Sequence, residues 1–395
     1  MERLVTSQLK LGIIAGGQLG KMLIQEASKW DIITWVLDKD EQCPAGSIAT
    51  HFVKGDHSEY ESVYQFGQNV DLLTFEMENI NVDALKKLKS EGLKIAPDPD
   101  ILELIQDKGL QKQFFRDAGI PSSPFRIHES AAAIQECIGN GSLLIPFVQK
   151  LRKGGYDGKG VTVVNSDYDL SFLLPGKCIT EDKIQIDREI SVITARNKKG
   201  EIRAYPVAEM SFEPTANLVD SLICPSSVPA LQAEKATAYA IEITERLGIE
   251  GLLAIEFFIT KNGEVIVNEM APRPHNSGHH TIESVITSQF EQHLRGILNL
   301  PLGSTRLKLP SVLVNILGED GYSGPVIYEG LTESMAIEGV KIHLYGKKFT
   351  KPFRKMGHAT ILATTPESAI EKAEKVKQLI KVKSWSQSLD RKSVV

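Results

Sequence analysis

With 395 residues, the chain is too long for one compact core, and about 150 residues per domain predicts two or three domains. Hydrophobic residues make up 42% of the chain and charged residues 24%, which excludes wholesale disorder. The net charge of -5, from 45 Lys and Arg against 50 Asp and Glu, is too balanced for a protein that binds nucleic acid through bulk positive charge.

The sequence carries no sign of a membrane or secretory segment. No apolar run approaches the ~18 residues that a membrane helix needs, and residues 1–15 lack the hydrophobic region and cleavage site of a signal peptide. The cysteines are Cys43, Cys137, Cys178 and Cys224. They lie far apart without a Cys-x-x-Cys pair, so neither a zinc site nor a disulfide framework is indicated. We therefore expect a cytoplasmic protein with reduced thiols and with no membrane or nucleic-acid partner.

The first hundred residues alternate short apolar runs with helical patterns. The expected strands and helices, in chain order, are strand 11–15, helix 19–30, strand 32–37, strand 72–75 and helix 82–90. Strand–helix–strand order with short loops predicts a parallel, doubly wound sheet. Pro97 and Pro99 mark a natural boundary after it.

The rest of the chain predicts a strand-rich middle and a mixed end. The expected helices are 107–118, 231–247 and a long amphipathic helix over 281–298, and the region 142–259 is otherwise strand-rich. A second linker is expected at 301–310. After it we expect strands at 312–317, 335–345 and 359–363, and a closing helix over 366–382 with proline at its first position.

A glycine turn follows the first expected strand. Gly16, Gly17 and Gly20 approximate a dinucleotide-binding fingerprint, with Ala15 at its first glycine position, and Asp38 ends the next strand where a ribose-binding acid would sit. Glycines and a helix N-terminus suit any phosphate, because they expose backbone N–H groups. The turn therefore leaves three interpretations: NAD, another phosphate-bearing ligand, which we favour, or a tight structural turn.

A second glycine-rich segment is more unusual. Residues 150–160 read Lys-Leu-Arg-Lys-Gly-Gly-Tyr-Asp-Gly-Lys-Gly and combine four glycines with four cations. Strand-like runs at 143–148 and 161–164 flank it, so it is the tip of a hairpin and not a Walker A loop. Such a flap can fold over a triphosphate, where its N–H and ammonium groups neutralise the charge on the transferred phosphoryl group. A solvated, flexible hairpin is the alternative.

Two glutamates are predicted to face each other across a second hairpin. Asn262-Gly263 is the signal of a two-residue turn between strands 252–260 and 264–269. That turn would pair Glu256 with Glu269, with their Cβ atoms roughly 5 Å apart. Because like charges repel, a divalent cation is the expected reason for the pair, and Mg²⁺ bridging nucleotide phosphates fits these oxygen ligands. An exposed sheet face with two unrelated glutamates is the alternative.

The segment after this hairpin is rich in donors for an anion. Arg273 can make a forked contact to phosphate or bicarbonate. Asn276, Ser277 and the N-terminus of the following helix offer further donors. We favour a functional role over a structural one for His275, because the neighbouring anion donors are expected to converge on the same place.

These features together resemble the ATP-grasp superfamily. The more specific resemblance is to the N5-carboxyaminoimidazole ribonucleotide synthetase family, and it covers nearly the whole chain. It is carried by Gly-Gly-Gln-Leu-Gly at 16–20, Gly-Gly-Tyr-Asp-Gly-Lys-Gly at 154–160, Ala-Pro-Arg-Pro-His-Asn-Ser-Gly-His at 271–279 and Lys-Met-Gly-His at 355–358.

The resemblance implies an α/β and α+β multidomain protein. A Rossmann-like N-terminal domain would cover residues 1–100. A two-lobed ATP-grasp domain would cover 101–300, with a lid around 150–165, and a small, mostly β C-terminal domain would cover 301–395. The implied enzyme is an ADP-forming ligase of purine biosynthesis that joins bicarbonate to 5-aminoimidazole ribonucleotide at the expense of ATP. It would use two Mg²⁺ ions, with Mn²⁺ as an alternative, form a homodimer and hand its product to a mutase.

The resemblance also assigns residues. Positions that match ATP contacts are Lys108, Lys150, the lid residues Gly155, Tyr156, Asp157, Gly158, Lys159, Gly160 and Val161, the adenine hinge Glu181, Asp182, Lys183 and Ile184, the ribose-binding Glu189, and Asn268 and Glu269. The metal ligands are Glu256 and Glu269. Positions that resemble the ribonucleotide site are Gln18, Leu19, Glu76, Tyr156, Asp157, Lys348, Arg354 and Lys355. The expected catalytic residues are Asp157, Arg273, His275, Asn276, Lys348 and Arg354.

Three other functions remain open at this point. The first is another ATP-grasp ligase, such as a formate-using ribonucleotide transformylase or a biotin carboxylase. The second is an NAD-dependent dehydrogenase built on the first glycine turn, which would leave the lid and the glutamate pair unexplained. The third is a non-catalytic nucleotide-binding scaffold, against which the intact Lys150, Glu256 and Glu269 argue.

Overall fold

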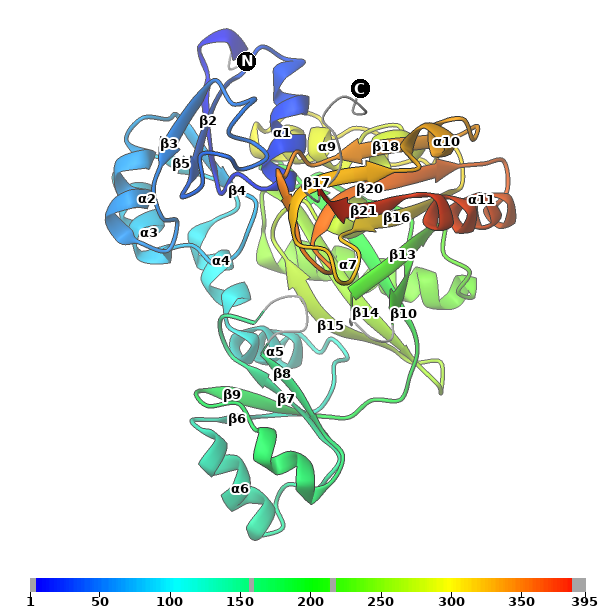
Figure 1. Ribbon diagram of the computed structural model, residues 1–395. Coiled ribbons are helices and arrows are strands. Elements are labelled where there is room, and N and C mark those ends of the chain that lie inside the picture. The colour runs from blue at the N-terminus through cyan, green and yellow to red at the C-terminus, as the bar shows by residue number, and fades with distance from the viewer. Residues whose placement is uncertain (1–4, 156–159, 214–217, 386–395) are drawn as a thin grey trace.

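The computed structural model describes residues 5–155, 160–213 and 218–385 and arranges them in three regions (Figure 1). The N-terminal region holds a five-stranded sheet in the order β3-β2-β1-β4-β5. Its strands are β1 Lys10–Ile14, β2 Ile33–Asp38, β3 His51–Lys54, β4 Leu72–Phe75 and β5 Lys94–Ile95. Its helices are α1 Gln18–Ser28, α2 Tyr60–Gly67, α3 Val82–Ser90 and α4 Pro99–Gln106.

Every strand pair of this sheet is parallel, which confirms the predicted doubly wound sheet. Successive residues of β1 point to opposite faces. Ile13 packs with α1 and with α9 (Gln289–Ile297) from farther along the chain, whereas Ile14 packs with α2 and α3. The strand order reverses between β1 and β4, and the ends of these two strands therefore form the crevice where such sheets bind ligands.

A small lobe follows and projects from the bottom of the molecule in Figure 1. Its antiparallel sheet has the order β6-β9-β7-β8, with α6 Ala131–Gly139 packed on it. The strands are β6 Phe125–His128, β7 Phe147–Leu151, β8 Val161–Val164 and β9 Cys178–Asp182. Pairing of β7 with β8 confirms that two strands of a hairpin flank the glycine-rich segment, although β7 runs from Phe147 to Leu151 and not over the predicted 143–148. Helix α5, Lys108–Asp117, links this lobe to the rest.

The largest sheet has nine strands and spans the central and C-terminal regions. Its central strands are β10 Ile186–Arg196, β11 Ile202–Ala204, β12 Ala208–Glu213, β13 Leu218–Cys224, β14 Gly251–Thr260 and β15 Val265–Ala271. Helix α7, Ala230–Leu247, packs on one face against Ile255 and Phe257 of β14. Because side chains alternate along a strand, Glu256 points away from α7, toward the opposite face.

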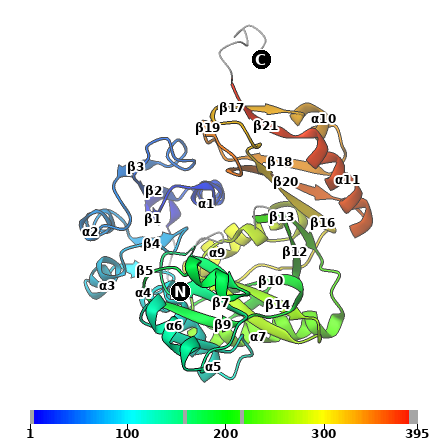
Figure 2. The ribbon, with the colours of Figure 1, turned by 60° about the horizontal axis from the view of Figure 1, so that its bottom comes forward.

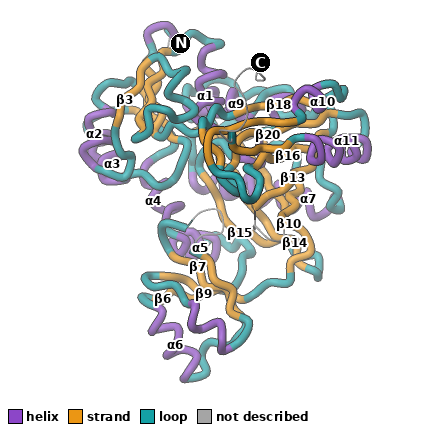
Figure 3. The backbone as a smooth tube through the Cα atoms, in the orientation of Figure 1, coloured by secondary structure: helices purple, strands orange, loops and turns teal. Residues whose placement is uncertain are grey.

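The C-terminal region continues the same sheet, since β16 pairs with β13 (Figure 2). Figure 3, in which strands are orange, shows that this region is mostly β-strand. Its elements are β16 Ser311–Leu317, β17 Gly324–Glu329, α10 Leu331–Met335, β18 Val340–Leu344, β19 Phe349–Thr350, β20 Lys355–Leu362, α11 Pro366–Leu379 and β21 Lys381–Ser384. Strands β19, β17 and β21 form a separate sheet. In the part of the chain that the structure describes, no helix is long and apolar enough to span a bilayer.

The predicted long helix over 281–298 is wrong. It is divided into α8 Thr281–Ser284 and α9 Gln289–Ile297. Val285 is extended and forms a bridge with Leu307, in keeping with the β-branched run Val285-Ile286-Thr287. Ser288 then starts α9, because its hydroxyl accepts a hydrogen bond from the backbone N–H of Glu291 at 3.1 Å.

Two C-terminal predictions also need correction. Residues 335–345 are not one strand, because α10 ends at Met335 and β18 begins at Val340. Gly339 between them has φ 90 and lies against the Leu362 carbonyl, a position that favours glycine. The closing helix stops at Leu379 and not at residue 382, since Val382 lies in β21 and pairs with Tyr328.

Candidate active site

The glutamate pair lies where the sequence predicts, but through a different turn. Thr260 and Glu264 close a three-residue loop, with the Gly263 N–H bonded to the Thr260 carbonyl at 2.8 Å. Near the turn, Phe257 therefore pairs with Val267, one residue out of the predicted register. Asn268 is an extra residue on β15, and this bulge restores the pairing of Glu256 with Glu269.

The bulge brings two consecutive polar side chains of β15 to lysines of the site. Asn268 Oδ1 accepts a hydrogen bond from Lys150 Nζ at 3.0 Å. The Glu269 carboxylate forms a close ion pair with Lys108 Nζ, from the first turn of α5. Across the strand pair, Glu256 Oε1 lies 3.6 Å from His275 Nε2. The acids and cations therefore come from the β14–β15 hairpin, from α5, from β7 at the base of the lid hairpin and from the loop after β15.

The electrostatics of the pair follow from their proximity. Burial, followed by the charges of Glu269 and Glu189, raises the pKa of Glu256. The neighbouring Lys108 ammonium group lowers the pKa of Glu269. Burial likewise raises the pKa of Glu189 to about 7. The site thus holds more carboxylates than its lysines neutralise.

The donor set fits a hard divalent cation. Two carboxylates from facing strands and an amide oxygen beside them are ligands that Mg²⁺ prefers. Among the described residues, no cluster of three or more His, Cys, Asp or Glu side chains could hold a metal by itself. One or two carboxylates completed by substrate phosphates and water is the usual arrangement for Mg²⁺.

A buried lysine in this site was not predicted from the sequence. Lys112 Nζ lies 3.2 Å from one oxygen of Glu181, and Lys150 Nζ lies 3.0 Å from the other. The Lys112 and Glu181 side chains are only 3% and 5% exposed, and burial lowers the pKa of Lys112 to about 8. The sequence could have indicated Lys112, because Lys108 and Lys112 are four residues apart and share one helix face.

The predicted adenine hinge is the end of β9 and the turn after it. The Glu181 carboxylate is engaged by lysines, so only its backbone is available to a base. The Asp182 N–H bonds to the Pro124 carbonyl at 3.0 Å, and Lys183 Nζ donates to Asn165 Oδ1 at 2.6 Å. Ile184 follows, half-buried, before β10.

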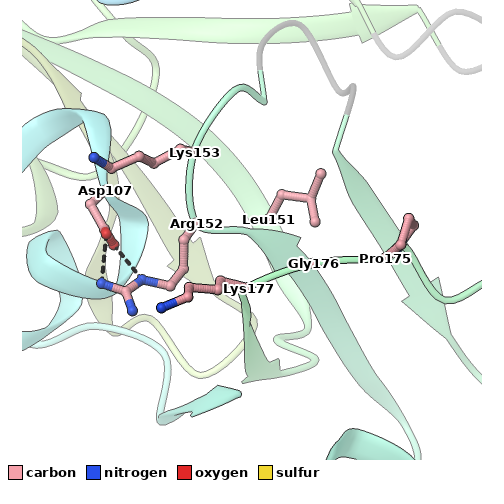
Figure 4. A pocket seen from close by; sticks show the side chains of 7 residues that line it. All are labelled: Asp107, Leu151, Arg152, Lys153, Pro175, Gly176 and Lys177. Carbon is pink, nitrogen blue, oxygen red and sulfur yellow. Dashed lines mark hydrogen bonds and ion pairs between the residues drawn. The ribbon is translucent and has the colours of Figure 1, made fainter. Parts of the chain in front are cut away.

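The lid base is tied to the helix that carries Lys108. Arg152 makes a forked contact to Asp107, with N···O distances of 2.8 and 2.6 Å (Figure 4). Asp107 also accepts the Gly109 N–H and so caps α5. A pocket of about 520 Å³ opens here, lined by Asp107, Leu151, Arg152, Lys153, Pro175, Gly176 and Lys177. None of the predicted site residues lies in that lining.

Several lid predictions cannot be placed. Gly155, Gly160 and Val161 flank the tip, and Gly160 accepts the Leu151 N–H at 2.8 Å. The tip itself, with Tyr156, Asp157, Gly158 and Lys159, lies outside the described residues.

The first glycine turn is occupied by carboxylates, which corrects the phosphate interpretation. Glu76, at the end of β4, accepts the N–H groups of Gly17 and Gly20 at 2.5 Å each. Asp38 accepts the Gly16 N–H at 2.7 Å. The N–H groups that would hold a phosphate are therefore already bonded to acids that repel one. The turn gives no support to NAD binding or to a dehydrogenase.

Other predicted substrate residues around this turn differ in accessibility. Gln18 begins α1 and is half-buried, whereas Leu19 is part of the core, so only its backbone can face a ligand. Glu76 is buried, and burial raises its pKa to about 7.

The loop after β15 converges on the glutamate pair. Arg273 Nε lies 2.8 Å from Glu78 Oε1. His275 Nδ1 lies 2.8 Å from Ser277 Oγ, which in turn contacts Ser191 Oγ at 2.8 Å. Asn276 follows in a 3-10 turn and is half-buried.

The predicted C-terminal cations lie on a different region. Lys348 is exposed, and its carbonyl accepts the Val326 N–H. Arg354 Nη1 donates to the Phe349 carbonyl at 2.6 Å. Lys355 begins β20, and its carbonyl accepts from Lys347 Nζ at 2.7 Å. Among the described residues, these contacts hold Lys348 and Arg354 within their own region and do not link them to the glutamate pair.

Comparisons with known proteins match the chain in three consecutive blocks. A ribonucleotide synthetase preATP-grasp domain matches residues 8–106, an ATP-grasp domain matches 113–290, and a phosphoribosylaminoimidazole carboxylase C-terminal domain matches 311–372.

Similar proteins align over most of the chain. The N5-carboxyaminoimidazole ribonucleotide synthase of Bacillus subtilis (strain 168) is 34% identical over 365 residues, which cover 91% of this chain and 93% of that protein. The chloroplastic phosphoribosylaminoimidazole carboxylase of Vigna aconitifolia is 37% identical over 371 residues, but the alignment spans only 65% of that longer protein.

Solved structures have the same fold. The N5-carboxyaminoimidazole ribonucleotide synthetase of Thermotoga maritima superposes with a TM-score of 0.88 at 43% identity, covering 96% of this chain and all of that one (100%). The N5-carboxyaminoimidazole synthase of Aspergillus clavatus, solved with ADP and 5-aminoimidazole ribonucleotide, gives a TM-score of 0.85 at 30% identity, covering 95% and 99%.

Proposed function

The chain belongs to the N5-carboxyaminoimidazole ribonucleotide synthetase family, and from this premise we propose how its site carries out the reaction. It is an ATP-grasp ligase that carboxylates 5-aminoimidazole ribonucleotide with ATP in purine biosynthesis, releasing ADP and phosphate. The observation that carries the proposal is the pairing of Glu256 with Glu269 opposite Lys108 and Lys150.

The first step forms carboxyphosphate. An oxygen of bicarbonate attacks the γ-phosphorus of ATP, the bond from that phosphorus to the bridging oxygen breaks, and ADP leaves. Lys108 and Lys150 transfer from their carboxylate and amide partners to the phosphates, and they supply fixed positive charge to the transferred group. Arg273 holds the bicarbonate by a forked contact.

Glu256 and Glu269, with Asn268 beside them, are the residues that would hold Mg²⁺. We take two ions as the working number and Mn²⁺ as the alternative metal. A metal held by these residues would supply positive charge to the phosphoryl group during transfer. Binding requires Glu256 to lose its proton, since only the carboxylate is a ligand.

The second step transfers the carbon to the substrate amine. The exocyclic amine attacks the carboxyl carbon of carboxyphosphate, or CO₂ released from it, phosphate leaves with the bridging oxygen, and the amine loses one proton. Asp157 is the residue expected to orient that amine or take the proton. Gln18 and Glu76 are proposed to lie around the ribonucleotide, and the lid closing over the site would exclude the water that hydrolyses carboxyphosphate.

Further parts of the proposal concern the ribonucleotide phosphate and the partners. Lys348, Arg354 and Lys355 are the cations proposed to hold that phosphate. The family resemblance supports a homodimer and a mutase as the enzyme that consumes the carbamate.

Omission of one reactant at a time tests the proposed function. Phosphate release should require ATP, bicarbonate, 5-aminoimidazole ribonucleotide and Mg²⁺ together. Equal release when formate replaces bicarbonate would assign the site to a transformylase instead. Release that ignores the ribonucleotide would contradict the proposed substrate.

A further inference from the structure

Glu78 links the ribonucleotide side of the site to the phosphate side. It lies on the loop after β4, two residues beyond Glu76, and its carboxylate is 2.8 Å from Arg273 Nε on the loop after β15. The Arg273 and Glu78 side chains are 17% and 30% exposed, so the pair is largely shielded from solvent. A shielded ion pair with direct contact constrains the geometry of both side chains.

Both ends of this contact are fixed by further hydrogen bonds. Gln106 Nε2 donates to the Glu78 carbonyl at 2.6 Å and to the Ile80 carbonyl at 2.9 Å, which holds the loop after β4 against α4. Arg273 Nη1 donates to the Pro274 carbonyl at 3.0 Å. The Pro274 contact uses one guanidinium N–H group, whereas the Glu78 contact is an ion pair without hydrogen-bond geometry at Nε, so N–H groups of the guanidinium remain for an anion.

The guanidinium also lies between acids of two regions. Its charge acts on Glu76 in the N-terminal crevice and on Glu256 at the glutamate pair, opposing the rise in the pKa of each that burial causes. Either acid would attract a guanidinium that was free to turn. Glu78 is the one acid in direct contact among the described residues, and it holds Arg273 from the side of the loop after β4.

We propose that Glu78 is a positioning residue that fixes the Arg273 guanidinium with its remaining N–H groups directed to the bicarbonate that becomes carboxyphosphate. This inference rests on the proposed function. Without the Glu78 charge, Arg273 turns toward Glu256 or Glu76 and the anion loses its forked partner. Carboxyphosphate then forms at a distance from the amine and is lost to water, so that ATP cleavage is uncoupled from carboxylation.

Glu78→Gln and Glu78→Asp in the full-length enzyme test the proposal. Glu78→Gln keeps the shape of the side chain and removes its charge, and we expect the KM for bicarbonate to rise at least about tenfold, as for loss of one charge-assisted contact. Phosphate released per carbamate formed should rise above one. The Kd for ATP should stay within about twofold, because Lys108 and Lys150 are untouched. Glu78→Asp should lie between the wild type and Glu78→Gln in both readouts.

Lys94→Met is the matched control for loosened packing. It removes another hydrogen bond between the same two parts of the chain, from Lys94 Nζ on β5 to the Ile297 carbonyl on α9. We expect Lys94→Met to keep the wild-type KM for bicarbonate and the wild-type stoichiometry. The same rise in both variants would overturn the proposal in favour of a general docking role.

Two further outcomes are decisive. If Glu78→Gln raises only the KM for the ribonucleotide, Glu78 is a substrate contact and the proposal is wrong. An unchanged KM for bicarbonate with one phosphate per carbamate also overturns it. Failure of the proposed function is distinguishable, because the wild-type enzyme itself would then show no phosphate release that depends on bicarbonate and the ribonucleotide.

Discussion

At the scale of single residues, the site is governed by an imbalance of charge. Glu189, Glu256 and Glu269 lie close enough to affect one another, and Lys108 neutralises only Glu269 directly. A lysine that pairs with a carboxylate in the free enzyme is available to bind phosphate only if another positive charge replaces it beside that carboxylate. A divalent cation held by these carboxylates would supply that replacement charge and would release Lys108.

Glu269→Gln is predicted to abolish ADP release stimulated by the ribonucleotide, with a fall in kcat of at least about 100-fold. The amide cannot replace the carboxylate charge toward the metal, and it frees Lys108 from its partner. The measurement is ADP formation at saturating Mg²⁺. Glu264→Gln, an exposed acid at the hairpin turn, is the control and should keep wild-type activity. Full turnover by Glu269→Gln would remove the metal role from this residue.

At the scale of elements, the break between α8 and α9 shows that local features, a β-bridge and a helix cap, can interrupt a helix that the apolar periodicity predicts. Apolar residues recur at helical spacing over 281–298, yet Val285 bridges to Leu307 and Ser288 caps a new helix. The cap serves a second purpose, because the Ser288 hydroxyl also lies 3.3 Å from Glu26 Oε1 on α1. The break therefore lets α9 pack on the N-terminal sheet.

Ser288→Ala is predicted to lower the free energy of unfolding by about 1 kcal/mol, the usual cost of losing an N-cap. Chemical unfolding of the variant at pH 7.5 measures it. Ser288→Thr retains a capping hydroxyl and should recover most of the loss. A Ser288→Ala variant as stable as the wild type would mean that Glu291 N–H finds water instead and that the cap does not hold the break.

The hairpin shows how far sequence reasoning reaches at this scale. Asn262-Gly263 marks the turn because Gly263 needs a positive φ, and the facing glutamates follow from strand pairing. No feature of the sequence indicates the bulge at Asn268. The predicted pairing of Glu256 with Glu269 is confirmed, but it results from two differences that cancel each other: a three-residue loop instead of a two-residue turn, and the extra residue Asn268 on β15. Lys112 could have been found from its spacing to Lys108. Its partner Glu181 could not, because that contact joins distant segments.

At the scale of the whole molecule, buried histidines link stability to pH. His279, His280, His293 and His358 are buried where the regions meet, and burial lowers the pKa of each, to about 3 for His280 and His293. His293, for example, joins Thr74 of the N-terminal sheet to the Leu252 N–H of the large sheet. The folded protein keeps these imidazoles neutral, whereas the unfolded chain protonates them below pH 6.5.

Acid is therefore predicted to destabilise the fold. Because the folded pKa values are depressed, the unfolded state binds more protons below pH 6.5, and stability falls as the pH drops from that value toward about 3. Each such histidine costs about 1.4 kcal/mol between pH 7.5 and 5.5. Chemical unfolding across this range measures the slope. His293→Gln should reduce the slope by one proton. Equal slopes in the variant and the wild type would contradict this account.

The assembly of the regions also decides which function the N-terminal sheet serves. Its topology alone fits a dinucleotide site, as the glycine turn suggests. Only the folded structure reveals that Glu76 and Asp38 occupy the turn, because both contacts span more than 20 residues. The crevice at β1 and β4 instead meets the loop after β15 through the contact of Glu78 with Arg273, so a nucleotide bound in that crevice would lie next to the proposed ATP site.

Transfer of ¹⁸O from labelled bicarbonate tests the central claim most directly. If bicarbonate attacks the γ-phosphorus and the amine then displaces phosphate, each phosphate released in the presence of ATP, Mg²⁺ and 5-aminoimidazole ribonucleotide carries one bicarbonate oxygen. Mass spectrometry of the phosphate reads this directly. Phosphate that carries oxygen only from ATP and water, at the full rate of ADP formation, would contradict the account, because the site would then be hydrolysing ATP without activating bicarbonate.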